Sequence, residues 1–154
     1  MKRRSFLKGT VASSMLGAAA SAGLLTPQSV LAAWPKAAFE AKTVDGGMEA
    51  ALGSSSVSES GDIKIKAPDI AENGAVVPIT ISTSIPDVDA IAVFIEKNPV
   101  PIACSYDLGA TTKGFVSCRV KMGKTSDLIA VVRSGGKLYS AKKMVKVTIG
   151  GCGG

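Results

Sequence analysis

Short apolar runs, separated by turn-forming residues, fill the chain from Asp62 to its C-terminal end and restrict its fold more than any other feature. Residues 77–85 alternate apolar and polar side chains, which is typical of half-buried strands. Residues 90–95 and 128–132 are almost continuously apolar, which is typical of central strands. No helical pattern lies among these runs. The sequence therefore predicts an all-β fold, an antiparallel immunoglobulin-like β-sandwich of about seven strands.

The run at residues 77–85 contains Pro78. Proline lacks a backbone N–H and cannot donate a hydrogen bond to a neighbouring strand. In sheets it is therefore found on edge strands and at bulges. We expect this run to be an edge strand or to contain a bulge.

Before the strands, apolar residues recur at intervals of three and four, which predicts a short amphipathic helix over residues 37–52. They are Ala37, Ala41, Val44, Met48 and Leu52. Gly46 and Gly47 interrupt the pattern and predict a kink. The polar run that follows, as far as Gly61, predicts a connecting loop. The helix is expected to dock on the domain core or on a partner.

The N-terminus carries the charges and the apolar run of an export signal, expected to be cleaved after Ala32 or Ala33. Arg3 and Arg4 followed by Phe6 resemble the twin-arginine type, which exports folded proteins. The alternative is a chance arginine pair before an ordinary secretory signal. The sequence thus predicts a periplasmic protein.

Cleavage divides the chain into four segments and changes its charge. The segments are residues 1–33 (signal peptide), 34–61 (helix and linker), 62–149 (sandwich domain) and 150–154 (C-terminal arm). The signal peptide removes four cations, so the net charge falls from +6 to 6 − 4 = +2. This small charge gives no reason to expect nucleic-acid binding. No later apolar stretch is long enough to span a membrane, so no membrane attachment is expected after cleavage.

The chain has no histidine, and this absence excludes whole classes of chemistry. Ser-His-Asp and Cys-His catalysis and imidazole metal ligation are impossible in such a chain. Neither a Walker loop nor a dinucleotide-binding fingerprint is present. We therefore expect no cofactor and no metal site, and we do not expect an enzyme.

The C-terminus places one thiol, Cys152, between two glycine pairs, Gly150-Gly151 and Gly153-Gly154. Glycines have no side chains to bury, so nothing is expected to hold this segment to a core. Five extended residues reach roughly 15 Å, enough to enter a cleft of another protein. No histidine or helix N-terminus is expected beside Cys152, so its activation must come from the site that the arm enters. The alternatives are an intermolecular disulfide and, less favoured, a metal ligand.

The other two cysteines, Cys104 and Cys118, are expected to face inward on neighbouring strands. The shared faces are Val100, Ile102, Cys104 and Tyr106 in one run, and Val116, Cys118, Val120 and Met122 in the next. A disulfide between the two cysteines would stabilise the fold by about 3 kcal/mol in the chain-entropy model. Two buried free thiols are the alternative, and a redox-active pair is less favoured.

The twin-arginine signal, the all-β domain and the terminus VKVTIGGCGG together resemble the SoxY family, the sulfur-carrier subunits of the bacterial thiosulfate-oxidising Sox system. The stretch IKIKAPDIAENGAVVPITI is also similar to that family. The resemblance covers the whole predicted mature chain. It implies that Cys152 is the site of covalent sulfur attachment and that the four glycines are its flexible flank. It does not extend to Cys104 and Cys118.

The resemblance also implies partners. They are SoxZ, as the second subunit of a heterodimer, the haem cytochrome SoxAX, which joins thiosulfate oxidatively to the carrier sulfur, and the dinuclear manganese hydrolase SoxB, which releases sulfate. The remaining sulfane sulfur is oxidised by a molybdenum-containing sulfane dehydrogenase in some organisms and passed to storage in others. The metals and haems belong to these partners.

Two other functions remain open at this point. The Gly-Gly end could carry sulfur as a C-terminal thiocarboxylate, although that chemistry requires cytosolic adenylation and the export signal argues against it. The chain could instead be a structural β-sandwich module that dimerises through Cys152. Replacing Cys152 with Ser separates the possibilities. Thiocarboxylate chemistry would survive the change, the carrier function would be lost, and a structural module would lose only its covalent dimer.

Overall fold

A computed structural model of the chain describes residues 35–148. The predicted signal peptide and the arm, with Arg3, Arg4 and Cys152, lie outside the described residues. The elements in order are α2 (Lys36–Glu40), α3 (Val44–Leu52), β1 (Val57–Glu59), β2 (Ile63–Lys66), β3 (Ile70–Ala71), β4 (Val77–Thr83), β5 (Val88–Ile95), β6 (Ile102–Asp107), β7 (Phe115–Val120), β8 (Ser126–Ser134) and β9 (Lys137–Val147).

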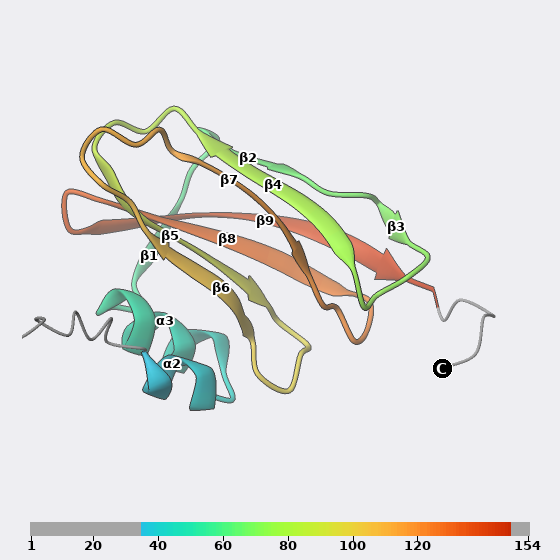
Figure 1. Cartoon of the computed structure of the whole chain (residues 1–154). Coiled ribbons are helices and arrows are strands. Elements are labelled where there is room, and N and C mark those ends of the chain that lie inside the picture. Colours follow the sequence, from blue (N-terminus) through green and yellow to red (C-terminus); the bar gives the residue numbers. More distant parts are fainter. Residues whose placement is uncertain (1–34, 149–154) are drawn as a thin grey trace, which may run out of the picture. The chain divides into compact units, whose positions relative to one another are not determined.

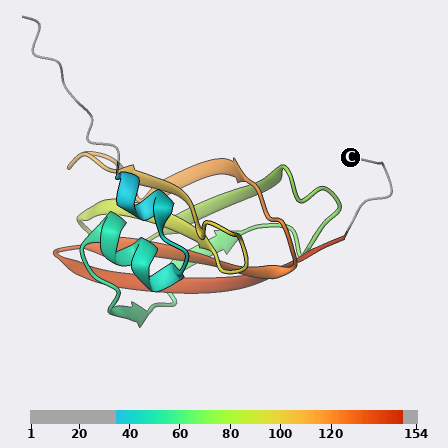
Figure 2. The same cartoon turned by 90° about the horizontal axis from the view of Figure 1, so that it is seen from below.

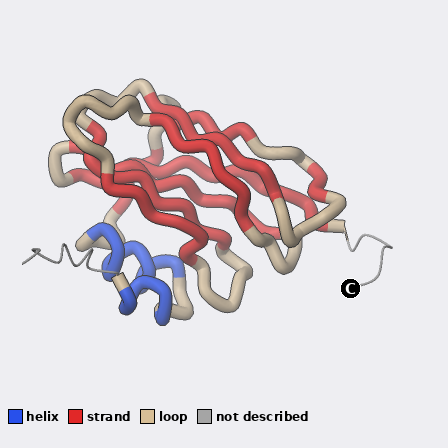
Figure 3. The backbone as a smooth tube through the Cα atoms, viewed as in Figure 1, coloured by secondary structure: helices blue, strands red, loops and turns tan. Residues whose placement is uncertain are grey.

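The strands form two sheets that face each other across a common apolar core (Figure 1, Figure 3). The larger sheet has the order β1-β9-β8-β5-β6, and β3 also pairs with β9; the smaller has the order β2-β4-β7. All pairings among β2 and β4–β9 are antiparallel. The all-β, immunoglobulin-like sandwich predicted from the strand pattern is confirmed.

The two continuously apolar runs are central strands, as predicted. β5 lies between β8 and β6, and β8 lies between β9 and β5. Both faces of these strands are buried, because one face lines the core between the sheets and the other is covered by the helices. Along β5, Ile91 and Val93 belong to the inter-sheet core, whereas Ala92 and Phe94 belong to the cluster under the helices. A strand that is covered on both faces needs no polar side of its own.

The prediction of a single helix is wrong, because the structure contains two helices in this segment. α2 ends at Glu40, and α3 begins at Val44, where the Thr43 side chain accepts a hydrogen bond from the Gly46 backbone N–H and so caps the helix. The glycines that suggested a kink lie inside α3. A Cβ on Gly47 would lie 3.1 Å from Cε1 of Phe94, so glycine permits close approach of the helix to the sheet.

Both helices lie across the outer face of the larger sheet, as Figure 2 shows from below. The apolar residues of the predicted helical stripe that become buried there include Met48 and Leu52, and Ala38 joins them. The expectation that this segment docks on the domain is confirmed. Within residues 35–148 no helix is long and apolar enough to cross a membrane.

Two short strands pair with β9 in parallel, which the sequence did not predict. β1 lies in the polar run expected to be a loop, and it pairs through Val57 with Leu138. β3 pairs farther along the same strand, through Ala71 with Val147. Strands of two or three residues are too short to produce a readable alternation.

The prediction that Pro78 marks an edge strand is wrong for the strand as a whole, because β4 is the middle strand of the smaller sheet. Proline still needs a position where its missing backbone N–H leaves no neighbouring strand without a donor, and Pro78 has such a position. β2 pairs with β4 only from Thr80 to Thr83, and Pro78 lies beyond the last of these pairs, opposite Arg119 of β7. At this residue the strand has one neighbour, so the missing N–H is compatible with the sheet.

Candidate functional site

The sequence places the candidate site at Cys152, and the structure describes the strand that leads to it. β9 is eleven residues long and pairs with β8 along its length from Lys137 to Val145. Figure 1 shows its arrowhead at the end of the sandwich opposite the β8–β9 hairpin. Cys152 and its four glycines lie outside the described residues. The described residues around the end of β9 form the root of the arm.

Backbone and side-chain hydrogen bonds hold the chain from two sides as far as Thr148. On one side, the Thr148 N–H donates to the Ala71 carbonyl at 3.1 Å, and the Lys146 N–H donates to the Asp69 carbonyl at 2.9 Å. On the other side, the Val147 N–H donates to the Thr125 hydroxyl oxygen at 3.0 Å. The last described residues are therefore a fixed root for the arm.

The smaller sheet also reaches this root, through Gly74. The Gly74 carbonyl accepts a hydrogen bond from the Met122 N–H at 2.7 Å. A Cβ on Gly74 would lie 2.7 Å from Cγ1 of Val147 and would also collide with the Met122 carbonyl. Any other residue would push the turn away from β9, so glycine is required for this packing.

A half-buried lysine joins β9 to the segment between β2 and β3. The Lys143 ammonium donates to the Ala67 carbonyl at 2.6 Å and lies 3.0 Å from a carboxylate oxygen of Asp69. The aliphatic stem of a lysine packs along apolar surface while its charged end reaches polar partners. This contact joins the two sheets on the side of the sandwich where β2 lies over β9.

The predicted cysteine pair comes together, but not in the predicted way. The structure confirms that Cys104 and Cys118 both pack against the inter-sheet core. Their strands are not paired, however: β6 pairs with β5, and β7 pairs with β4. The prediction that the two cysteines lie on neighbouring strands of one sheet is therefore wrong. Their sulfur atoms face each other between the sheets at 3.8 Å, and both are free thiols here. The disulfide stays a prediction.

A β-bulge also corrects the predicted face of the first cysteine strand. Cys104 pairs with Val93, and Ile102 pairs with Phe94, so Ala103 is an extra residue in β6. Ile102 therefore points toward the helices, whereas Cys104 points into the inter-sheet core. The sequence alternation hides this change because residues 101–104, around the bulge, are all small or apolar.

Tyr106 lies beside both thiols, and the three groups influence one another. Burial raises the pKa of the Cys104 thiol from 9.0 to about 12, and the neighbouring Cys118 adds to this increase. Partial burial and the charge of the Cys104 thiolate raise the pKa of Tyr106 to about 12. Tyr106 remains 37% exposed. At neutral pH the Cys104 thiol is therefore protonated.

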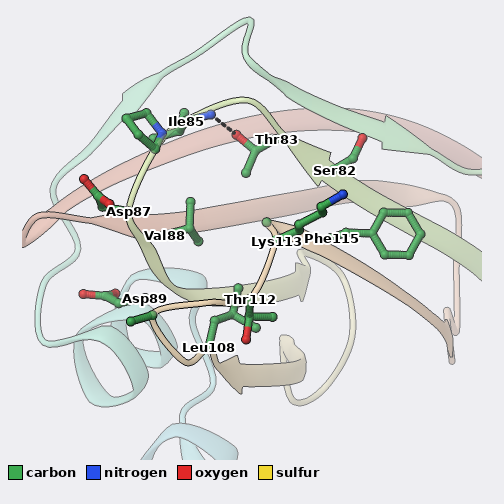
Figure 4. A pocket seen from close by; sticks show the side chains of 13 residues that line it. Ser82, Thr83, Ile85, Asp87, Val88, Asp89, Leu108, Thr112, Lys113 and Phe115 are labelled. Carbon is green, nitrogen blue, oxygen red and sulfur yellow. Dashed lines mark hydrogen bonds between the residues drawn. The ribbon is translucent and has the colours of Figure 1, made fainter.

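A pocket of about 620 Å³ lies at the other end of the sandwich from the root of the arm. Figure 4 shows side chains from the β4–β5 segment, including Thr83, on one side and from the β6–β7 segment, including Thr112 and Phe115, on the other. The Thr83 hydroxyl accepts a hydrogen bond from the Ile85 N–H at 3.1 Å. None of the residues that the sequence singles out for chemistry lines this pocket.

The arm cannot reach this pocket from Thr148 on the same chain. Val88, which lines the pocket, pairs with Ser134, and Ser134 pairs with Lys137 at the start of β9. From Lys137 to Thr148 a strand rises roughly 36 Å. Cys152 follows Thr148 by four residues, which span at most about 14 Å. The pocket is therefore not a resting place for the thiol of its own chain.

Among residues 35–148, no group of three or more acidic or cysteine side chains is placed to hold a metal ion. The described surroundings of the root include strand backbone, threonine hydroxyls, Lys143 and the Asp69 carboxylate. This arrangement can hold the start of an arm, and the described residues show no catalytic constellation there.

The model of the family described as "Sulfur oxidation protein SoxY" matches residues 48–152. The chain belongs to the SoxY family. The match begins inside α3 at Met48, covers the nine strands of the described residues, and ends on Cys152 itself, so the terminal cysteine lies within the region that the family shares. SoxY is the sulfur carrier protein of the Sox system.

A solved structure supports the same conclusion. The sulfur carrier protein SoxY from Chlorobium limicola f thiosulfatophilum is 48% identical, with a TM-score of 0.64, over 70% of this chain and 97% of that one. Two other structures are similar at a lower level. A chain from a study of T cell activation by toxic shock syndrome toxin-1 has a TM-score of 0.41 at 8% identity, covering 56% of this chain and 99% of its own. The PKD domain of an M14-like peptidase from a Thermoplasmatales archaeon has a TM-score of 0.37 at 16% identity, covering 55% and 91%. These two similarities carry no argument. The search of curated proteins gave no match.

Proposed function

We propose that this protein is a periplasmic sulfur carrier that binds thiosulfate-derived sulfur covalently on Cys152 and presents it to partner enzymes. The observation that carries the proposal is the family match that extends to Cys152. The fixed root of β9 supports it, because Thr148 is held by β3 while the five residues of the predicted arm follow Ile149. A carrier of this kind bears the substrate through the pathway and does not catalyse the reactions.

The proposed chemistry has two steps, and each step balances. In the first, the Cys152 thiolate and the sulfane sulfur of thiosulfate form an S–S bond, giving Cys–S–S–SO₃⁻ and two electrons, which a haem cytochrome of the SoxAX type accepts. In the second, water attacks the sulfonate sulfur with a SoxB-type hydrolase, and sulfate and a proton leave. The product is a persulfide on Cys152.

In this proposal, the residues of this chain position the Cys152 thiol but do not activate it. The sequence around Cys152 offers no histidine and no helix N-terminus to generate a thiolate. The sandwich fixes the point from which the terminal residues start. The partner cleft then supplies the groups that activate the thiol.

The proposed heterodimer with SoxZ needs a surface that the domain does not already use. The apolar side of the two helices is not available, because Met48 and Leu52 are buried against the larger sheet. The helical segment, which the sequence left as able to dock on a partner, packs on its own domain instead. The outer faces and edges of the strands remain.

The experiment is intact-mass measurement of the protein purified from cells during thiosulfate oxidation, before and after a reductant, with mapping of the C-terminal peptide. The expected result is a reductant-labile sulfur adduct on Cys152 that is absent from Cys152→Ser. Cys118→Ser is the matched control, because it removes another thiol and should leave the adduct on Cys152. A bare Cys152 thiol throughout turnover would overturn the proposal.

The same measurement decides between the proposal and the two other functions. A structural module would give only a symmetric Cys152 disulfide between two chains. A thiocarboxylate carrier would place the extra sulfur on the Gly154 carboxyl and would retain it in Cys152→Ser. Each outcome has its own mass and its own mapped residue.

A further inference from the structure

We propose that Cys104 and Cys118 are oxidised to a disulfide that joins the two sheets at their open side. This bond is separate from the chemistry proposed for Cys152. It also differs from a disulfide within one sheet, because it connects two edge strands that share no strand pairing.

The geometry places the two sulfurs for this bond. β6 is the edge of the larger sheet and β7 is the edge of the smaller one, and Figure 1 shows them on the same side of the sandwich. The sulfurs are 3.8 Å apart, and an S–S bond is about 2.05 Å long. Rotation of the side chains can close a gap of under about 2 Å, since both thiols already point toward each other between the sheets.

Different groups hold the two sides of the sandwich together. Where β2 lies over β9, Lys143 joins the sheets through the Ala67 carbonyl and the Asp69 carboxylate. On the other side, the Asn98 side chain donates to the Lys121 carbonyl and accepts from the Gly123 N–H just beyond the end of β7. Between β6 and β7 themselves, the thiols of Cys104 and Cys118 face each other, with Tyr106 beside them. A covalent bond between Cys104 and Cys118 would link these two edge strands directly.

The reaction needs an oxidant, which we take to be a disulfide of a small thiol or of a protein. Cys104 keeps its proton at neutral pH, since burial raises its pKa to about 12. We therefore assign the first attack to Cys118, whose sulfur forms a mixed disulfide and releases one external thiol. Cys104 then attacks the Cys118 sulfur, loses its proton and displaces the second external thiol. Two thiols and one external disulfide become one protein disulfide and two external thiols.

The bond leaves Cys152 as the one thiol of the chain. The disulfide does not depend on the proposed function.

The test uses purified Cys152→Ser protein, so that every change of mass reports on the cysteine pair. The protein is reduced, freed of reductant, incubated with oxidised glutathione, denatured and alkylated with iodoacetamide. We expect a chain lighter by two hydrogens, with no alkyl group and no bound glutathione. The melting temperature should be higher than that of the reduced protein by roughly 10 °C and should fall again with reductant.

Single variants provide the matched controls. Cys104→Ser and Cys118→Ser, made in the same background, should each retain one cysteine that is alkylated or glutathionylated. Their melting temperatures should no longer rise with the oxidant. The comparison of oxidised and reduced protein requires neither variant, so the test remains decisive even if one of them fails to fold.

The proposal is overturned if the oxidised protein takes up two alkyl groups, if it retains glutathione as a stable adduct, or if oxidation leaves its melting temperature unchanged. Because Cys152 is absent throughout, none of these outcomes bears on the carrier function. Conversely, failure of the carrier function leaves the expected results here unchanged.

Discussion

The sulfur atoms of Cys104 and Cys118 lie 3.8 Å apart, although their strands belong to different sheets. Two edge strands come face to face because the chain crosses from one sheet to the other through residues 108–114. Both thiols are partly buried, and the pKa of Cys104 is raised to about 12. This relationship makes the stability of the reduced protein sensitive to alkaline pH.

We predict that the reduced protein loses stability between about pH 9 and pH 12. The folded pKa of Cys104 lies above its ordinary value of 9.0, so the folded state retains a proton that the unfolded state releases. The contribution is complete below pH 9.0 and disappears as the pH rises toward about 12. Tyr106, raised from 10.0 to about 12, acts in the same direction. Urea unfolding at a series of pH values measures the loss.

Cys104→Ser is the control for this pH dependence, since serine does not ionise in this range. Its free energy of unfolding should fall less steeply across the alkaline window. The interpretation fails if the variant and the reduced wild-type protein show the same slope.

Gly74→Ala should destabilise the root of the arm. Its Cβ would lie 2.7 Å from Cγ1 of Val147 and would strike the Met122 carbonyl, so the turn must move away from β9. We expect a loss of about 1–3 kcal/mol in the free energy of unfolding, the usual range for overpacking. Gly61→Ala is the matched control, because its Cβ meets nothing within 4 Å. Equal losses in both variants would show that the packing at Gly74 is not tight.

Thr125→Val should loosen the end of β9 without opening the core. The Thr125 hydroxyl accepts a hydrogen bond from the Val147 N–H at 3.0 Å, and valine has the same shape but no acceptor. We expect a loss of about 1 kcal/mol and faster amide hydrogen exchange at Val147. Thr125→Ser keeps the hydroxyl and should preserve slow exchange. Unchanged exchange in the valine variant would mean that this bond does not hold the root.

Gly47→Val should weaken the docking of α3 on the larger sheet. A Cβ at this position would lie 3.1 Å from Cε1 of Phe94, and the two methyl groups beyond it would come closer still. We expect a loss of about 1–3 kcal/mol by chemical denaturation. Ala50→Val, at an exposed position of the same helix, should cost under about 1 kcal/mol. A similar loss in both variants would point to helix propensity and not to packing as the cause.

Much of the architecture follows from local patterns. The continuous apolar runs predicted that β5 and β8 are central strands, since only a strand covered on both faces can do without polar side chains. Alternation also predicted correctly that Cys104 and Cys118 face the core. The break between α2 and α3 was missed because the capping threonine, Thr43, is a weaker sequence signal than the glycine pair beside it.

The sequence by itself determined the all-β class, the inward direction of the two internal cysteines and the candidate thiol at Cys152. Each of these depends on residue types and on spacing along a single strand or terminus. Only the tertiary structure decided that β6 and β7 belong to different sheets, that β1 and β3 run parallel to β9, and that a bulge at Ala103 turns Ile102 toward the helices. Side-chain alternation fixes which face of a strand is buried, whereas the neighbour of a strand is selected by packing between segments distant in the chain.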